Sequence, residues 1–366
     1  MATESSRRRS TASAAFSPGG SVAETRLLKP IEFEAPYLVF VGDTEDKLLA
    51  KTGFGIVQWR REQCLAQYRF DDAGVDLGLP EMKIDEAARN GAKSLVVGVA
   101  NVGGYYPESW REALIEAVGA GLDVVAGMHT RLRDVPGLAE AANRAGARLV
   151  DVRVPPSGLP VGTGRKRSGK RLLTVGTDCA AGKKYTALAL EREMLARGVD
   201  ATFRATGQTG IMITGSGIPI DAVVADFVSG AAEALSPDND PDHWDLIEGQ
   251  GSLHHPAYAG VSLGLLHGSQ PDAIVVCHEV GRTEIDFWED FPVPSIKHCI
   301  DTVLQMGRLT NPEIRCVGVS LNTSHSAADR REKHLREVAR ETGLPCVDPL
   351  VDGVGTIVDL IQEWRS

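Results

Sequence analysis

Short runs of apolar residues alternate along this chain with longer segments in which apolar residues recur at helical spacing. Apolar runs bounded by glycine or proline are typical of buried strands, and the helical spacing is typical of the helices that cover them. We expect strands over residues 37–41, 93–100, 122–126, 148–152, 172–176, 201–206, 243–248, 273–277, 314–321 and 345–347. We expect helices over residues 107–118, 138–145, 184–197, 226–235, 296–306, 327–342 and 353–364. This alternation predicts an α/β protein whose parallel sheets carry helices on both faces.

Composition divides the chain into four parts. Residues 1–30 are rich in Ser, Arg, Ala and Thr and lack a long apolar run, so we expect a disordered tail. A first domain over residues 31–154 and a second over residues 169–366 are separated by residues 155–168, whose prolines, glycines and basic run indicate a linker. Within the domains, residues 51–55 and 211–220 are expected to be loops, because glycines interrupt both.

Charge and cysteine content narrow the class of function. The 366 residues carry a formal net charge of -10, which argues against nucleic acid or an anionic membrane as partner and favours a small molecule. The sequence also lacks an apolar run of about 18 residues, so no membrane span is expected. Six scattered cysteines without a C-x-x-C pair indicate thiols in a reducing compartment, and we expect a cytoplasmic protein that forms a homo-oligomer.

One stretch combines an apolar strand, a glycine-bounded turn and a helix start. Backbone amides in such a turn, together with a helix N-terminus, bind phosphate groups, and a lysine adds a full charge. The sequence therefore predicts a phosphate cradle, although a turn of this kind that binds nothing also fits the pattern. The candidate residues are Gly176, Thr177, Asp178, Cys179, Ala180, Ala181, Gly182, Lys183, Lys184, Tyr185 and Thr186, and Gln208 follows the next strand beside them.

The cradle differs from the common G-x-x-x-x-G-K-[ST] pattern. Five residues separate Gly176 from Gly182, and Lys184 stands where a metal-binding hydroxyl normally follows the lysine. If magnesium is used, Asp178 is a candidate ligand, and Thr177 or Thr186 is a candidate source of the hydroxyl.

A second stretch carries an acidic residue and glycines at the end of a short strand. Glu248 is followed by Gly249, Gln250, Gly251 and Ser252, and a carboxylate in this position reaches a magnesium ion in phosphate-loop proteins. A buried structural glutamate is the alternative. His254 and His255 follow directly, and we expect Glu248, His254 and His255 to be the catalytic residues, with the proton acceptor near Glu248 or His254, because a histidine titrates near neutral pH. Solvated loop histidines are the alternative for His254 and His255.

Strand ends in the first domain offer further candidates. Ligands of parallel sheets bind at the carboxyl ends of the strands, and the clusters of residues 101–104, 128–131 and 151–153 at these ends are each able to line a small-molecule site. The first two clusters contain Asn101, His129 and Arg131. We expect these three residues to bind substrate, while local hydrogen bonding within the loops is the alternative.

The cradle, the turn after Glu248 and the strand-ending Asn322 resemble the dethiobiotin synthetase class of P-loop enzymes. That resemblance implies that the loop holds phosphates, that Asp178 and Glu248 hold magnesium, and that Asn322 recognises adenine. Lys184 departs from the pattern of that class. The implied function is an ATP- and magnesium-dependent ligase or kinase that activates a carboxylate.

A resemblance over residues 31–366 is closer. The stretches 76–80, 98–104, 121–129, the cradle and 248–256 resemble a two-domain family that includes the D-glutamate N-acetyltransferases. This implies a Rossmann-like first domain, a doubly wound P-loop NTPase-like second domain, and acetyl transfer from acetyl-CoA to the amine of a D-amino acid, with D-glutamate as the leading candidate. ATP with magnesium stays open as the alternative, and so does a module that binds a nucleotide without turnover.

Overall fold

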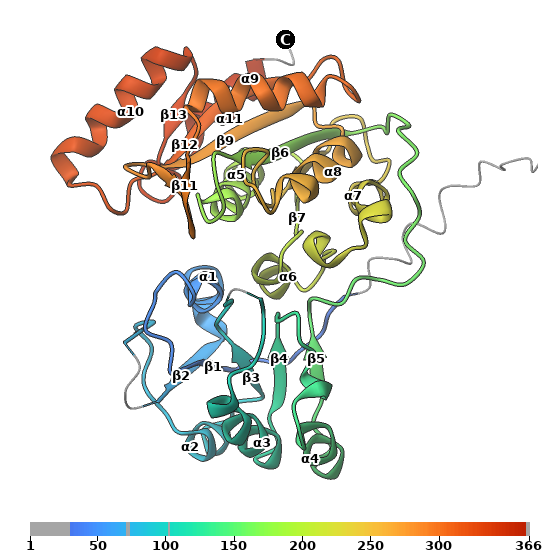
Figure 1. Cartoon of the computed structure of the whole chain (residues 1–366), viewed down its shortest axis with the longest axis vertical. Coiled ribbons are helices and arrows are strands. Elements are labelled where there is room, and N and C mark those ends of the chain that lie inside the picture. Colours follow the sequence, from blue (N-terminus) through green and yellow to red (C-terminus); the bar gives the residue numbers. More distant parts are fainter. Residues whose placement is uncertain (1–29, 71–73, 102, 364–366) are drawn as a thin grey trace, which may run out of the picture.

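The computed structural model describes residues 30–70, 74–101 and 103–363. Two α/β domains lie one above the other in Figure 1, each built on a parallel sheet. The expected tail falls almost entirely in residues 1–29, outside the described ranges. No helix in the described ranges has the length and apolar character needed to cross a bilayer.

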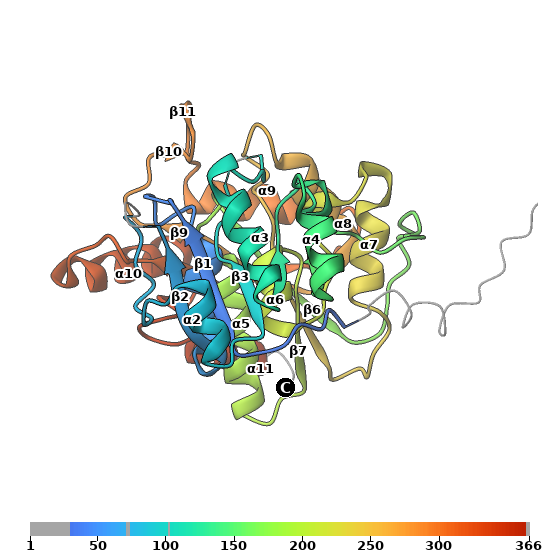
Figure 2. The same ribbon diagram turned by 90° about the horizontal axis from the view of Figure 1, so that it is seen from below.

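The first domain contains a five-stranded parallel sheet with the strand order β2-β1-β3-β4-β5. The helices α2, α3 and α4 lie side by side over the sheet, as the view from below shows (Figure 2). The strands β1, β3 and β4 are almost entirely buried, because helices or loops cover both faces. The strands are β1 (Tyr37–Gly42), β2 (Cys64–Arg69), β3 (Ser94–Val97), β4 (Asp123–Ala126) and β5 (Leu149–Asp151), and the helices are α1 (Lys51–Arg60), α2 (Ile84–Arg89), α3 (Arg111–Gly119) and α4 (Leu138–Ala145).

The second domain contains a six-stranded parallel sheet with the order β13-β12-β9-β6-β8-β7. Strand β6, which precedes the cradle, lies in the middle of this sheet, where the strand order reverses and ligands bind in such folds. Its strands are β6 (Lys170–Gly176), β7 (Ala201–Arg204), β8 (Trp244–Ile247), β9 (Ala273–Glu279), β12 (Arg315–Asn322) and β13 (Cys346–Val347), and a hairpin of β10 (Glu284–Ile285) and β11 (Trp288–Pro292) follows β9. The helices are α5 (Lys183–Ala196), α6 (Gln208–Thr214), α7 (Val228–Leu235), α8 (Ala259–Ser269), α9 (Ile296–Gly307), α10 (Ala328–Thr342) and α11 (Gly355–Glu363).

Helices α1 and α6 lie between the two sheets and join the domains (Figure 1). The Thr52 and Thr209 hydroxyls are 2.9 Å apart in a buried position. One apolar core runs from the first domain into the second and includes Leu188 on α5 and Ile211 on α6. The domains therefore share buried surface as well as a linker.

The first predicted loop is wrong, because residues 51–55 begin α1, and the second is wrong in its first part, because residues 211–214 belong to α6 whereas residues 215–219 are irregular. The glycines that suggested loops are sites of close approach. A Cβ on Gly55 would lie 2.7 Å from Thr209 Cγ2, and one on Gly210 would lie 2.4 Å from Glu248 Oε2. Glycine thus permits the contact between the helices and the site, at the expense of helix propensity.

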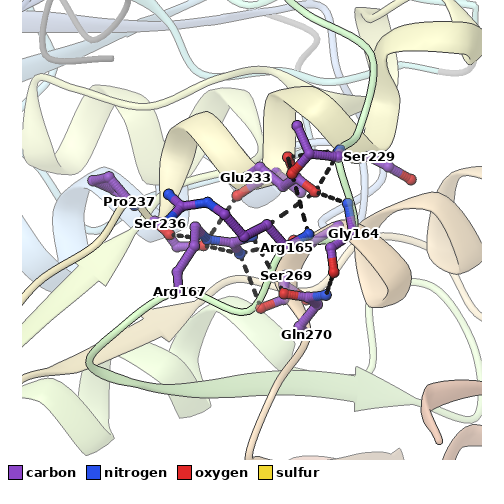
Figure 3. A network of polar contacts seen from close by, with 12 residues as sticks. Gly164, Arg165, Arg167, Ser229, Glu233, Ser236, Pro237, Ser269 and Gln270 are labelled. Carbon is purple, nitrogen blue, oxygen red and sulfur yellow. Dashed lines mark hydrogen bonds and ion pairs between the residues drawn. The ribbon is translucent and has the colours of Figure 1, made fainter. Parts of the chain in front are cut away.

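The basic end of the linker is bound to the second domain (Figure 3). The Arg167 side chain is buried, and it donates hydrogen bonds to the carbonyl oxygens of Ser236 at 2.7 Å and Gly268 at 2.8 Å. Glu233 accepts hydrogen bonds from the backbone amides of Thr163 and Gly164. These contacts fix the path of the linker along α7.

The chain crosses between the domains at two places. The Ile31 amide donates a hydrogen bond of 2.6 Å to the Gly215 carbonyl at the end of α6, so the described chain begins against the second domain before it enters β1. The linker after β5 makes the second crossing, and both lie on the right in Figure 1.

Candidate active site

The cradle is the connection between β6 and α5. Gly182 has a φ of 103°, a left-handed conformation that favours glycine, and α5 begins at the next residue. Lys183 is mostly buried, and its ammonium donates a 2.7 Å hydrogen bond to the Asp178 carbonyl across the loop. The loop thereby presents the helix N-terminus and a lysine at one place, as the sequence predicts.

The cradle faces a cavity of about 500 Å³ between the domains. The carboxyl ends of the two sheets contribute opposite walls, because Asn101, His129 and Arg153 follow β3, β4 and β5, while Gly207 and Glu248 follow β7 and β8. The predicted residues that line this cavity are Asn101, His129, Cys179, Ala180, Gly182, Lys183, Lys184, Tyr185, Gln208, Glu248, Gly249, Gln250, Gly251 and His255.

The other predicted residues do not line it. Gly176 and Ser252 line a small pocket behind the cradle, and Thr177, Ala181 and Asp178 are buried in the loop. Arg131 is exposed at the start of a turn, and Asn322 contacts Glu279 at 3.5 Å. His254 packs against His298 in a tilted arrangement, with ring centroids 5.1 Å apart.

The residues that would bind magnesium in a P-loop enzyme do not fit the ion here. Asp178 Oδ2 accepts hydrogen bonds from Arg282 at 2.7 Å and from the Asp286 amide at 2.9 Å, and its Oδ1 accepts one from the Cys179 amide. The Thr186 hydroxyl lies 2.8 Å from the Ser320 hydroxyl and faces the core. Asp178, Cys179 and His255 lie close together, but the ion pair with Arg282 occupies the carboxylate and burial raises the pKa of the thiol.

Lys184 occupies the sequence position of the usual metal-binding hydroxyl and places an ammonium group there. Its pKa is lowered to about 8, because burial disfavours the ammonium more than Glu248 stabilises it. The Glu248 carboxylate accepts hydrogen bonds from the Thr206 and Gly207 amides at 3.0 and 3.1 Å, and burial raises its pKa. At the position where a P-loop enzyme binds its metal ion, this chain therefore has the Lys184 ammonium and the Glu248 carboxylate, which accepts hydrogen bonds from two backbone amides.

The turn after Glu248 passes very close to the cradle strand. A Cβ on Gly249 would lie 1.7 Å from the Thr174 carbonyl oxygen, so only glycine fits there. The Gly249 amide donates to the Thr174 hydroxyl at 3.0 Å, and the Ser252 hydroxyl donates to the Thr177 carbonyl at 3.1 Å. These bonds hold the turn against the cradle.

Two histidines line the cavity, one from each domain. Burial lowers the pKa of His129 and of His255, so both are neutral at neutral pH and are able to accept a proton. Arg153 and Asp221 also act on the pKa of His129, whereas Asp178 and Lys183 act on that of His255. His129 therefore belongs to the first-domain wall and His255 to the cradle.

Several charged residues of the cavity are not among the site residues predicted from the sequence. Lys51 begins α1, Arg153 follows β5, and Asp221 lies in a short 3-10 helix of the second domain. Arg153 belongs to the strand-end cluster 151–153, which the sequence marks as able to line a small-molecule site without giving Arg153 a role. No local pattern pairs it with Asp221, because the two residues come from different domains.

Charge makes the cavity suitable for an anionic ligand. Lys47, Lys51, Lys183, Lys184 and Arg153 face it, opposed by only three carboxylates, those of Asp221, Glu248 and Asp286. Lysine and arginine form short, strong hydrogen bonds with phosphate and carboxylate groups. The arrangement is able to hold a phosphate-bearing molecule at the cradle and a second, smaller anion at the first domain.

Comparisons with known proteins agree with this architecture. A family model described as the P-loop domain of DUF1611, a domain of unknown function, matches residues 160–358, and the DUF1611 Rossmann-like domain matches residues 67–155. Two curated relatives, from Tritonibacter scottomollicae and a Pseudoalteromonas species, are 50% and 47% identical over 328 residues, which cover 90% of this chain and 98% and 99% of theirs. Both are named D-glutamate N-acetyltransferase. A crystal structure of a DUF1611 family protein from Anabaena variabilis is 32% identical, with a TM-score of 0.81, and the match covers 90% of this chain and 99% of that one.

Proposed function

This chain belongs to the DUF1611 family, and on that premise we propose that it is a D-glutamate N-acetyltransferase that uses acetyl-CoA. The observation that carries the proposal is the identity of about half of all positions with two relatives of that name, over nearly their whole length. The unpaired cysteines support a reducing compartment, and we place the enzyme in the cytoplasm.

The proposal assigns the cradle to the diphosphate of coenzyme A. Lys183, the amides at the start of α5 and Lys184 supply positive charge without a metal ion, and Glu248 acts as a positioning residue for Lys184 and the neighbouring turn. Acetyl transfer leaves every phosphate bond intact. A metal to activate a phosphoryl group is therefore unnecessary.

In the proposed reaction the neutral amine of D-glutamate attacks the thioester carbonyl carbon. The new C–N bond forms, the C–S bond breaks, and the sulfur leaves as a thiolate. Of the two protons that the substrate ammonium loses, one ends on the sulfur and one leaves to solvent. His129 is the proposed acceptor of the first proton, because it is neutral, lines the cavity and lies within the electrostatic reach of Arg153 and Asp221.

Negative charge develops on the carbonyl oxygen during the attack and requires hydrogen-bond donors. The Gly249 amide is already bonded to the Thr174 hydroxyl, so it is unsuitable for this role. The proposal assigns it to the amides of Gln250 and Gly251, which follow in the cavity wall.

A thiol-release assay tests the function. Purified protein with acetyl-CoA and D-glutamate should release coenzyme A, should do so in excess EDTA, and should act much more slowly on L-glutamate. Release of ADP from ATP in the presence of magnesium, without thiol release from acetyl-CoA, would instead identify a carboxylate-activating ligase or kinase. Absence of both reactions, together with tight nucleotide binding, would overturn the assignment as an enzyme.

A further inference from the structure

Three buried polar atoms without partners belong to residues that line the cavity. Within the described residues, Arg153 Nε, Asp221 Oδ1 and Asn101 Oδ1 form no hydrogen bond. A buried polar atom without a partner costs free energy, and such atoms are uncommon in folded proteins. Other such atoms lie elsewhere in the described chain, but these three belong to residues of one cavity, and a small adjustment of their side chains around a bound ligand would use their hydrogen-bonding capacity.

Arg153 and Asp221 face each other across the domain boundary. Arg153 Nη2 lies 3.1 Å from Asp221 Oδ2 and donates a 2.5 Å hydrogen bond to Gln208 Oε1. The Arg153 side chain is only 10% exposed, yet Nε remains unused, as does the second oxygen of Asp221. The pair thus offers one cationic donor and one anionic acceptor side by side.

We propose that Arg153 and Asp221 form the binding site for the amino-acid substrate, with Arg153 contacting its α-carboxylate and Asp221 its α-ammonium. The inference rests on the proposed function and deepens it by locating the acceptor. An α-amino acid carries both charges on one carbon, so it matches an adjacent guanidinium and carboxylate, and a planar guanidinium suits a carboxylate especially well.

Two neighbours support this location. His129, the proposed proton acceptor, lies within the electrostatic reach of both Arg153 and Asp221, so an ammonium bound there is close to a neutral imidazole. The Lys51 ammonium lies within reach of both Arg153 and Lys183, between the two walls of the cavity. The proposed acceptor site and the cradle therefore open into one space, as transfer between two substrates requires.

The test is calorimetric titration of the full-length protein, saturated with coenzyme A, with two ligands. D-Glutamate carries the α-carboxylate, and D-isoglutamine replaces it with an amide. We expect Arg153→Met to weaken D-glutamate binding by roughly tenfold to a hundredfold, the loss typical of one charged hydrogen bond. The same substitution should change D-isoglutamine binding by less than about twofold, because the contact is already missing.

A matched control and a second variant separate this role from a purely structural one. Arg144→Met changes an exposed arginine of α4 and should leave both titrations as in the wild type. Asp221→Asn should weaken the binding of D-glutamate but leave the affinity for coenzyme A within about twofold of the wild-type value. An Arg153→Met variant whose affinities for D-glutamate and D-isoglutamine fall equally, or whose affinity for coenzyme A also falls, would overturn the proposed site. Arg153 would then only connect the two domains.

Failure of the enzymatic function would look different. A wild-type protein that binds D-glutamate in this Arg153-dependent way but releases no thiol would refute the acetyltransferase and leave the amino-acid site standing. A wild-type protein that acetylates D-glutamate while Arg153→Met keeps its KM would refute the site and leave the function standing.

Discussion

Among single residues, Lys183 places one positive charge inside the cradle. Its ammonium bonds to the Asp178 carbonyl, a neutral acceptor that a phosphate oxygen is able to replace. The residue is also largely buried, so its charge is poorly screened by solvent.

Replacing Lys183 with alanine should weaken acetyl-CoA binding by roughly tenfold to a hundredfold, because one charged hydrogen bond is lost. Calorimetric titration measures the change. Lys297→Ala removes an exposed lysine of α9 that pairs with Asp301 and serves as the control. Unchanged affinity in Lys183→Ala would mean that the ligand does not use the cradle.

Lys184 gives the site a dependence on pH. With a pKa of about 8 in the free protein, roughly half of the ammonium is deprotonated at pH 8, and a bound polyanion raises that pKa. Binding at pH 8 should therefore take up as much as about half a proton, and affinity should fall as the pH rises above 8.

Titrations in two buffers of different ionisation enthalpy, such as HEPES and Tris, measure this uptake directly. Lys184→Met should abolish the difference between the buffers. Uptake of the same size in that variant would assign the proton to another group, such as His129 or His255.

The sequence predicted the cradle side of the site better than the opposite wall. Residues 182–184 follow one another, and a local pattern of strand, glycine and lysine marks them in the sequence. Arg153 and Asp221 come together only because the second domain folds against the first. Arg131 lies in the connection after β4 rather than at the end of the strand, and it is exposed directly before a 3-10 turn, which no spacing reveals.

At the scale of the element, the glycines decide how strands and helices approach. The alternation of strand and helix was predictable, because buried parallel strands are continuously apolar, as in β3 and β9. Helix α6 was not predictable from the sequence, because its glycine and threonine residues favour loops and its stability comes from burial between the domains. Strand β2 at the sheet edge, half-buried and partly polar, was missed for a similar reason.

Gly249→Ala should destabilise the protein by at least about 2 kcal/mol, because the added methyl group collides with the Thr174 carbonyl and separates β8 from β6. Urea unfolding measures the loss, which should be accompanied by weaker acetyl-CoA binding.

Gly260→Ala is the matched control for this change. That glycine lies in α8 with open space around its Cβ position, so alanine should stabilise the protein by up to about 1 kcal/mol. Equal effects of the two substitutions would contradict the close approach of β8 and β6.

At the scale of the whole molecule, the two domains are parts of one folding unit. Phe40 and Leu95 of the first domain belong to the same buried core as Leu188 and Phe203 of the second. Loss of either domain would expose apolar surface of the other, and this cost couples their unfolding.

Thermal unfolding should therefore show a single transition, with a calorimetric enthalpy equal to the van't Hoff value. The described tryptophans lie in both domains, Trp59 and Trp110 in the first and Trp244 and Trp288 in the second, so fluorescence should follow the same curve as calorimetry. Acetyl-CoA should raise the midpoint. Two separated transitions would show that the domains unfold independently.

The double crossing of the chain constrains how ligands enter. A single connection between two domains allows them to twist as well as to separate. Two connections on the same side restrict twisting. The two connections here are residues 31–36 and the linker, on the right of Figure 1. Ile31 donates a hydrogen bond to the Gly215 carbonyl, and Arg167 donates one to the Ser236 carbonyl. Any separation of the two walls has to break the contact between the Thr52 and Thr209 hydroxyls, and two connections on the same side restrict the direction of that separation.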